Sequence, residues 1–353
     1  MLVCSTRWMK NPDLASMRKK SKFPSVVTEG GVAENPRPSS EVFYSSGSTT
    51  LDLALGSGWA KSRIHNLWGN EASGKTLLAI SACHQFRRAW PGEPILYIDS
   101  ERRMNRDYAR TLGFPEDAEL VNECSTVEDF HERVLKMAKD GSGGGLVVLD
   151  SLDALEDEME LGRSMSDKTM PATKARKMSE AFRRLVGPLH AAGITLLILS
   201  QVREKVGVVF GNPYARAGGK AVDFYASQIV SLTVKGKEKV TRTLSPGKTM
   251  ERVVGVSVEA TVRKNSVAPP WRKALLKIYY SRGLDDVESI LDFFAMVGYG
   301  KTEKDYFPKG NLSSEDVRMG FENIRKDMRE LYMKIEDAFV SDDPVWATKI
   351  LEN

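Results

Sequence analysis

The sequence predicts an α/β fold with a mostly parallel central sheet. Between residues 46 and 285, apolar runs alternate with helical patterns, which is typical of strands joined by covering helices. The runs are nearly continuous in apolar residues, as expected for strands that are buried on both faces. A glycine-rich loop, residues 69–76, follows the first run and precedes a stretch that suits a helix.

The elements of this sheet can be placed in order along the chain. Between the third and fourth strands, apolar residues from Met178 to Leu189 recur at helical spacing. The last two strands would finish the sheet. The expected strands are Ile64–Trp68, Ile95–Asp99, Leu146–Asp150, Ile194–Ser200, Ile229–Val234, Val253–Ala260 and Ala274–Tyr280.

Two flanking segments differ from this pattern. Residues 1–45 mix charges, proline and serine without a steady period, so we expect an N-terminal arm before a core of residues 46–285. Residues 286–353 predict a small helical C-terminal domain. There Ser313 and Asp316 have the spacing of a capping box. A stripe at 4-3 spacing follows: Val317, Phe321, Ile324, Met328, Leu331, Ile335 and Ala338. It could seat a partner helix, but packing onto the domain's own core is the favoured interpretation.

Composition bounds the class of protein. With 41% hydrophobic residues among 353, the chain can bury a large core, and its net charge of +4 only weakly favours an anionic partner. No window approaches 18 apolar residues, and the start lacks the apolar stretch of a signal peptide. Its 3 cysteines include no C-x-x-C spacing, which argues against disulfides or a zinc site. We therefore expect a cytoplasmic protein with no membrane partner.

The glycine-rich loop fits the pattern G-x-x-x-x-G-K-[ST] of nucleotide-phosphate loops. In such a loop, backbone N–H groups surround phosphate oxygens, the lysine reaches the β- and γ-phosphates, and the hydroxyl ligates Mg²⁺. A glycine turn with a surface lysine is the alternative, and the flanking strand and helix argue against it. The expected ATP-binding residues here are Gly69, Asn70, Glu71, Ala72, Ser73, Gly74, Lys75 and Thr76, with Thr76 as a metal ligand.

Three polar residues follow the next strands. Asp150 ends a buried strand at the edge where α/β sheets bind ligands, so we expect it to hold Mg²⁺ through water, although a helix N-cap is the alternative. Glu101 lies just past another strand and could orient an attacking water. Gln201 ends the fourth strand and could sense the γ-phosphate. On pattern alone, an ordinary strand-to-helix turn is favoured for Glu101, and a capping or turn role is favoured for Gln201.

An ordered series of motifs resembles the RecA-type DNA strand-exchange recombinases, both cellular and virus-encoded. The resemblance covers roughly residues 46–285. The motifs are Gly47–Gly56, the loop Gly69–Thr76, Tyr97–Glu101, Tyr108–Gly113, Val148–Leu155, Gln201–Pro213, Gly218–Ser227 and Lys264–Pro269.

The resemblance implies a role for each matching residue. Glu101 matches the catalytic glutamate, and Tyr108 matches the aromatic residue that stacks on adenine. Gln201 matches the glutamine that couples the γ-phosphate to DNA, and Lys264 matches a lysine that reaches a neighbouring subunit's nucleotide. Residues 162–175 and 202–217 correspond to the two DNA-binding loops. The expected DNA-binding residues are Arg176, Arg183, Arg203, Lys205, Val206, Gly211, Asn212, Gly218 and Gly219.

Two departures from the family pattern affect these expectations. Bacterial members often read Lys-Asn-Lys where this chain reads Lys264-Asn265-Ser266, and Ser266 cannot supply the second charge. We expect slower or less tightly coupled hydrolysis as a result. Asn105 stands where members often carry aspartate near the adenine, so the base preference is open.

The expected function is an ATP- and Mg²⁺-dependent recombinase. It would form a helical filament of its own copies on single-stranded DNA and exchange strands with a homologous duplex. The resemblance places a subunit-docking segment in the N-terminal arm, and single-strand-binding or loader proteins are candidate partners. One alternative is an annealing or mediator ATPase without full strand exchange. Another is a filament scaffold that binds nucleotide but scarcely hydrolyses it.

Overall fold

A computed structural model describes residues 42–140, 143–158, 171–204, 214–216, 219–245, 247–307 and 313–341. These residues belong to one compact unit that spans Arg37–Asn353. Most of the expected N-terminal arm lies outside the described residues. No helix within the described ranges is long and apolar enough to span a bilayer.

The predicted α/β architecture is confirmed. A large sheet has the strand order β12-β11-β10-β9-β3-β7-β6-β4-β5, and β8 pairs with β7. Its middle and one flank are parallel, because β9, β3, β7, β6, β4 and β5 all run in one direction. The other flank is antiparallel, from β9 through β12. A separate two-stranded sheet joins β1 (Phe43–Tyr44) to β2 (Trp59–Ala60).

The seven expected strands are all present in the large sheet as β3, β4, β6, β7, β9, β10 and β11, whereas the short strands β5, β8 and β12 were not predicted. Their bounds are β3 Ile64–Gly69, β4 Ile95–Asp99, β5 Glu119–Val121, β6 Gly145–Asp150, β7 Ile194–Glu204, β8 Tyr214–Arg216, β9 Gln228–Ser245, β10 Lys248–Asn265, β11 Lys273–Tyr279 and β12 Gly283–Asp285. The helices are α2 Thr49–Leu55, α3 Lys75–Ala89, α4 Arg106–Thr111, α5 Val127–Lys139, η2 Leu152–Ala154, α7 Pro171–Ala192, α8 Gly219–Tyr225, α9 Asp286–Val297, α10 Glu303–Tyr306 and α11 Ser314–Ser341.

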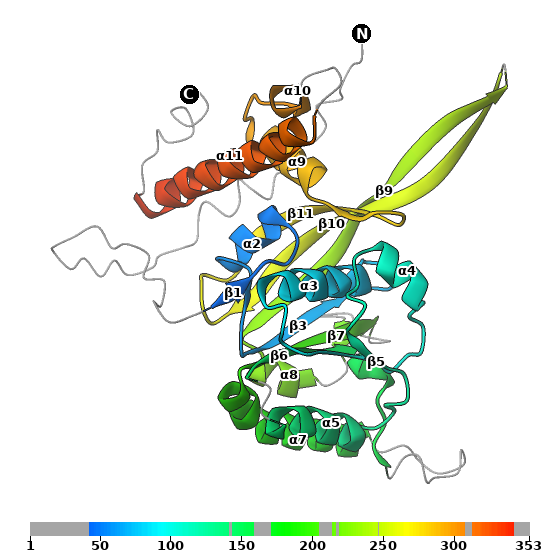
Figure 1. Ribbon diagram of the computed structural model, residues 1–353, viewed down its shortest axis with the longest axis vertical. Helices are drawn as coiled ribbons and strands as arrows, with labels where there is room; N and C mark the ends of the chain where they lie inside the picture. Colours follow the sequence, from blue (N-terminus) through cyan, green and yellow to red (C-terminus); the bar gives the residue numbers. More distant parts are fainter. Residues whose placement is uncertain are drawn as a thin grey trace. The chain divides into compact units, whose positions relative to one another are not determined.

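Helices cover the parallel part of the sheet on both faces (Figure 1). In β6, Leu146 and Val148 belong to the apolar cluster that contains α3, whereas Val147 and Leu149 belong to the cluster that contains α5 and α7. Because successive side chains of a strand point to opposite faces, both sets must be apolar. This is the physical reason for the continuous apolar runs in the sequence.

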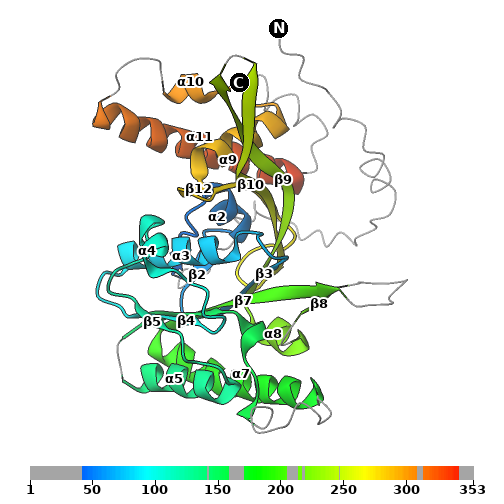
Figure 2. The ribbon, with the colours of Figure 1, turned by 90° about the vertical axis from the view of Figure 1, so that its right-hand side faces the viewer.

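The hairpin of β9 and β10 differs from the prediction. We expected strands at Ile229–Val234 and Val253–Ala260, but each strand has 18 residues. The length added toward the tip of the hairpin is almost entirely exposed, so it carries no apolar run that would mark it as a strand. Figures 1 and 2 show this pair extending beyond the other strands of the sheet.

The helical prediction for residues beyond 285 is also confirmed. Ser313 and Asp316 bond reciprocally: the Asp316 N–H donates to Ser313 Oγ over 3.1 Å, and the Ser313 N–H donates to Asp316 Oδ2 over 2.9 Å. In the stripe, Ile324, Met328 and Leu331 are buried in a cluster formed with α9 and α10. The stripe therefore packs onto the domain's own core, as the favoured interpretation held.

Candidate active site

The carboxyl ends of four neighbouring parallel strands bring the candidate residues together. Gly69 at the end of β3 lies opposite Gln201 of β7. Asp99 at the end of β4 lies opposite Asp150 at the end of β6. Since β7 and β6 are also neighbours, these ends form one edge of the sheet. Ligands of α/β sheets bind at such an edge.

The phosphate loop links β3 to α3 in a conformation that requires glycine at one position. Gly74, immediately before α3, has a φ of 87°, and a Cβ there would lie 2.5 Å from Cδ1 of Ile278. An alanine would be both strained and crowded. The Ser73 hydroxyl is buried and has no hydrogen-bond partner in the described part of the chain. A cradle with an unsatisfied hydroxyl at a helix N-terminus fits a phosphate group.

Lys75 is the first residue of α3 and its ammonium group folds back on the loop. Nζ donates to the carbonyl oxygen of Gly69 over 2.9 Å and to that of Asn70 over 2.8 Å. The side chain is buried, and this desolvation lowers the pKa of Lys75, while Asp150 and Glu101 oppose the shift. The positive charge is thus held inside the loop and faces carboxylates.

Thr76 and Asp150, the two expected metal ligands, are in direct contact. The Thr76 hydroxyl donates to Asp150 Oδ2 over 2.8 Å, and the Tyr97 hydroxyl donates to the same oxygen over 2.8 Å. Burial raises the pKa of Asp150, and the two hydroxyl donors oppose that shift. A hydroxyl and a carboxylate in contact beside a phosphate loop are oxygen ligands that suit Mg²⁺. The residues present therefore fit a magnesium-bound nucleotide.

Glu101 and Gln201 are in direct contact. The Gln201 side-chain amide donates to Glu101 Oε1 over 2.6 Å, and the Ser151 hydroxyl donates to the same oxygen. Arg103 forms an ion pair with Glu101 Oε2 over 3.1 Å. The backbone N–H of Gln201 donates to Asp153 Oδ2 over 2.7 Å, which fixes this part of β7. The expectation that Gln201 ends its strand is wrong, because β7 continues to Glu204 and pairs there with β8.

Tyr108 lies on α4, away from this cluster of carboxylates. Its ring is 45% exposed, and its hydroxyl donates to the carbonyl oxygen of Tyr280. Asn105 caps α4, because its side-chain oxygen accepts from the Tyr108 N–H over 2.9 Å. The cap explains why a short polar residue stands at this position.

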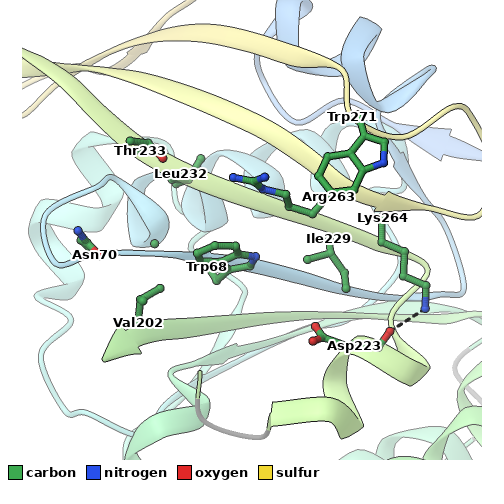
Figure 3. Close-up of a pocket in the computed structure, with 11 residues that line it drawn as sticks. Trp68, Asn70, Val202, Asp223, Ile229, Leu232, Thr233, Arg263, Lys264 and Trp271 are labelled. Carbon is green, nitrogen blue, oxygen red and sulfur yellow. Dashed lines mark hydrogen bonds between the residues drawn. The ribbon is translucent and has the colours of Figure 1, made fainter. Parts of the chain in front are cut away.

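Lys264 is held apart from its own phosphate loop. It lines a pocket of about 770 Å³ whose walls also include Trp68, Asn70 and Trp271. In Figure 3, Asn70 and Lys264 lie at opposite ends of this pocket. Lys264 Nζ donates to the carbonyl oxygens of Asp223 over 2.7 Å and of Phe224 over 3.0 Å, at the end of α8. Burial lowers the pKa of Lys264.

The predicted DNA-binding residues are only partly described. Arg176 and Arg183 are exposed on α7. Arg203 belongs to β7, where it lies opposite Ala215 of β8, and Gly219 is the first residue of α8. Lys205, Val206, Gly211, Asn212 and Gly218 lie outside the described residues, as does most of the first expected DNA loop.

Several contacts to the candidate residues were not predicted. Tyr97 was quoted only as part of a motif, and the roles of Ser151, Arg103 and Asp153 were missed. Ser151 and Arg103 lie within two residues of a predicted site residue, which is a usable signal. Tyr97 reaches Asp150 only because β4 and β6 are neighbours, and the sequence pattern carries no signal for that pairing.

Comparisons with known proteins agree with this geometry. The family model described as RecA N-terminal domain matches residues 23–285. Protein RecA of Corynebacterium diphtheriae is 35% identical over 308 residues, which cover 86% of this chain and 78% of that protein. Protein RecA 1 of Myxococcus xanthus is 34% identical over 318 residues, 90% of this chain and 87% of that protein. Protein RecA of Cutibacterium acnes is 35% identical over 299 residues, 84% and 81% respectively.

Proposed function

The chain belongs to the RecA family, and from that premise we propose that it is an ATP- and Mg²⁺-dependent recombinase. It assembles on single-stranded DNA as a helical filament of its own copies, pairs that strand with a homologous duplex and exchanges strands. The observation that carries this proposal is the contact between Gln201 and Glu101. This contact connects Glu101, at the edge of the sheet beside the phosphate loop, to β7. Strand β7 leads into residues 205–213.

The residues at the carboxyl edge of the parallel strands have different roles in nucleotide binding. Bound ATP with Mg²⁺ supplies the free-energy difference between the DNA-binding and the DNA-releasing states. Lys75 and the loop N–H groups hold the phosphates, and Thr76 and Asp150 hold the cation, the latter through water. Glu101 orients the attacking water, because its carboxylate lies past β4 at the same edge as the phosphate loop and touches Gln201 there.

Gln201 couples nucleotide binding to DNA binding. Any other hydrogen-bond acceptor at this edge competes with Glu101 for the Gln201 side-chain amide, while the Gln201 backbone N–H is held by Asp153. A phosphate oxygen that accepted from the amide would leave Glu101 Oε1 with the Ser151 bond and room for water, and it would shift Gln201, which lies three residues before the end of β7. The chain that follows β7 is then reordered for single-stranded DNA, with Arg176, Arg183, Arg203 and Lys205 neutralising phosphates without reading sequence.

Self-association completes the site. Lys264 bonds to the end of α8 in its own chain and lies across the pocket from Asn70. We assign it to the nucleotide of a neighbouring copy in the filament, where an added cation stabilises phosphate charge. Single-strand-binding or loader proteins are further proposed partners, and the cytoplasm is the proposed location.

The test is ATP turnover by the full chain with and without single-stranded DNA, with Lys75→Ala as the control. We expect turnover that rises when single-stranded DNA is added and that is lost in the control. If turnover is scarcely detectable in both conditions, the chain is a nucleotide-binding scaffold and the proposal fails. An annealing ATPase would pass this test and is separated by duplex invasion, described at the end of the Discussion.

A further inference from the structure

The outer part of the β9–β10 hairpin, residues 237–253, is a ribbon that no other described strand joins. β9 pairs with β3 only as far as Leu232, and β10 pairs with β11 only from Gly255 onward. Between these points and the tip, the two strands pair with each other alone. Figures 1 and 2 show the pair leaving the sheet. At about 3.4 Å per residue, the ribbon reaches about 30 Å.

The ribbon carries an excess of unpaired positive charge. Its charged residues are Lys237, Glu238, Lys239, Arg242, Lys248, Glu251 and Arg252. Glu238 is engaged by Lys277 over 2.7 Å, and Glu251 is engaged by Lys239 over 2.7 Å. Both carboxylates are therefore neutralised. Within the described residues, no ion-pair partner is found for the four other cations, and all four are exposed: Lys237, Arg242, Lys248 and Arg252.

The two faces of the ribbon differ. Arg242 lies opposite Met250, and Val240 lies opposite Arg252, so these four side chains share one face. That face presents guanidinium groups between exposed apolar side chains; Val240 is 41% exposed and Met250 is 57% exposed. The other face carries the Lys239–Glu251 ion pair and three threonines, which can donate hydrogen bonds to phosphate. These threonines are Thr241, Thr243 and Thr249.

We propose that this ribbon is a binding arm for duplex DNA, which it contacts through the phosphate backbone and the major groove. A two-stranded ribbon fits the major groove, which is about 12 Å wide. Arginine is among the side chains that most often contact base edges in that groove. Four unpaired cations match a polyanion. The choice of duplex as partner deepens the proposed function, in which a homologous duplex must be captured.

The composition of the ribbon favours duplex DNA over the other candidates. Binding of single strands relies on aromatic side chains on which bases stack, and residues 237–253 contain no Phe, Tyr or Trp. Protein interfaces bury aromatic anchors and are depleted in lysine at their centre. An isolated hairpin is only marginally stable in water, so a phosphate backbone along it would also hold it in place.

The test compares the full chain with a variant in which Lys237, Arg242, Lys248 and Arg252 are all replaced by Gln. Fluorescence anisotropy follows binding of a labelled duplex and a labelled single strand of equal length, without nucleotide, across a salt series. Losing four phosphate contacts should reduce the steepness of the plot of log duplex affinity against log salt concentration by about 3.6. Between about 50 and 200 mM salt, the duplex affinity of the parent should therefore fall by a factor about 100 times larger than that of the variant. Single-strand binding should change far less.

Two further variants sharpen the outcome. A control variant removes the same charge from exposed helix positions, and it should keep the salt dependence of duplex binding seen in the parent. In this control, Gln replaces Arg88, Lys136, Lys139 and Arg329. A second variant, Arg242→Lys with Arg252→Lys, keeps the charge of the ribbon and should also keep that salt dependence. Equal slopes in parent and ribbon variant, an equal loss of single-strand binding, or a change confined to self-assembly would each overturn the proposal. ATP turnover stimulated by single-stranded DNA is measured separately and reports on the proposed function. The ribbon proposal and the proposed function can therefore fail independently.

Discussion

The side-chain amide of Gln201 donates to Glu101 Oε1 over 2.6 Å, although 100 positions separate the two residues in the chain. This contact joins β7, three residues before its end, to the carboxylate past β4, across the intervening strand β6. A residue that leads into the expected DNA loop therefore touches the residue expected to orient water. The account of coupling between DNA and ATP depends on this pair.

Replacing Gln201 with Ala should uncouple hydrolysis from DNA. The amide is lost while the backbone bond from Gln201 N–H to Asp153 remains available. The ratio of ATP turnover with single-stranded DNA to turnover without it should fall toward one. Gln85→Ala on α3, a matched change away from the edge, should keep the parent ratio. Strong stimulation retained in the Gln201 variant would count against the coupling role.

Replacing Glu101 with Gln should separate binding from hydrolysis. Glutamine keeps an oxygen that accepts from Ser151 but cannot act as a base, so turnover should fall by about 10²- to 10⁴-fold. ATP-dependent binding of single-stranded DNA, followed by anisotropy, should persist. Loss of both properties together would contradict the roles assigned here.

Replacing Ser266 with Lys should raise turnover stimulated by DNA. Ser266 is exposed, and its backbone N–H donates to the Ser227 carbonyl oxygen, so a longer side chain has room. A second cation beside Lys264 would add charge at a neighbouring copy's nucleotide. We expect a gain of about tenfold, below the 10³-fold or more of an arginine finger. A steady-state ATPase assay that finds no gain would refute this explanation of slow hydrolysis.

Asp52 should make stability depend on pH. Burial raises the pKa of this carboxyl to about 6, against hydrogen bonds from Ser45 and Ser46. The folded state thus holds the proton more tightly than the unfolded chain, so the stability that Asp52 contributes is full below about pH 4 and is lost as pH rises through about 6. A shift of about two units corresponds to about 3 kcal/mol.

Urea unfolding of the parent and of Asp52→Asn from pH 4 to pH 7.5 checks this expectation. Asparagine can accept the Ser46 N–H through its oxygen and donate its amide N–H to Ser45 Oγ. It also stays neutral, so the variant should match the parent near pH 4 and exceed it in stability above pH 6. Parallel curves over this range would show that Asp52 ionises in the folded protein much as it does in the unfolded chain.

The sequence predicted what depends on local pattern. The apolar runs predicted the buried strands, and the rule that parallel strands end at one edge brought Asp150 and Gln201 near the phosphate loop. It could not predict contacts that depend on strand order. Tyr97 reaches Asp150 because β4 lies beside β6. The outer β9–β10 ribbon was missed because it buries no face, so it lacks the apolar signal on which strand prediction rests.

The family roles rest on more than single patterns. Nothing in the pattern of Lys264-Asn265-Ser266 alone assigns Lys264 to a neighbouring copy; that expectation came from the resemblance. The structure adds that Lys264 is engaged by carbonyl oxygens of Asp223 and Phe224. Residues 205–213, which hold much of the second expected DNA loop, lie outside the described residues, so their roles stay predictions.

The most direct test of the account is pairing of a single strand with a homologous supercoiled duplex by the full chain in the presence of ATP and Mg²⁺. The account predicts joint molecules that require homology and that disappear in Lys75→Ala. Tight single-strand binding without joint molecules, under conditions where turnover is stimulated by that strand, would contradict strand exchange and favour an annealing or mediator ATPase.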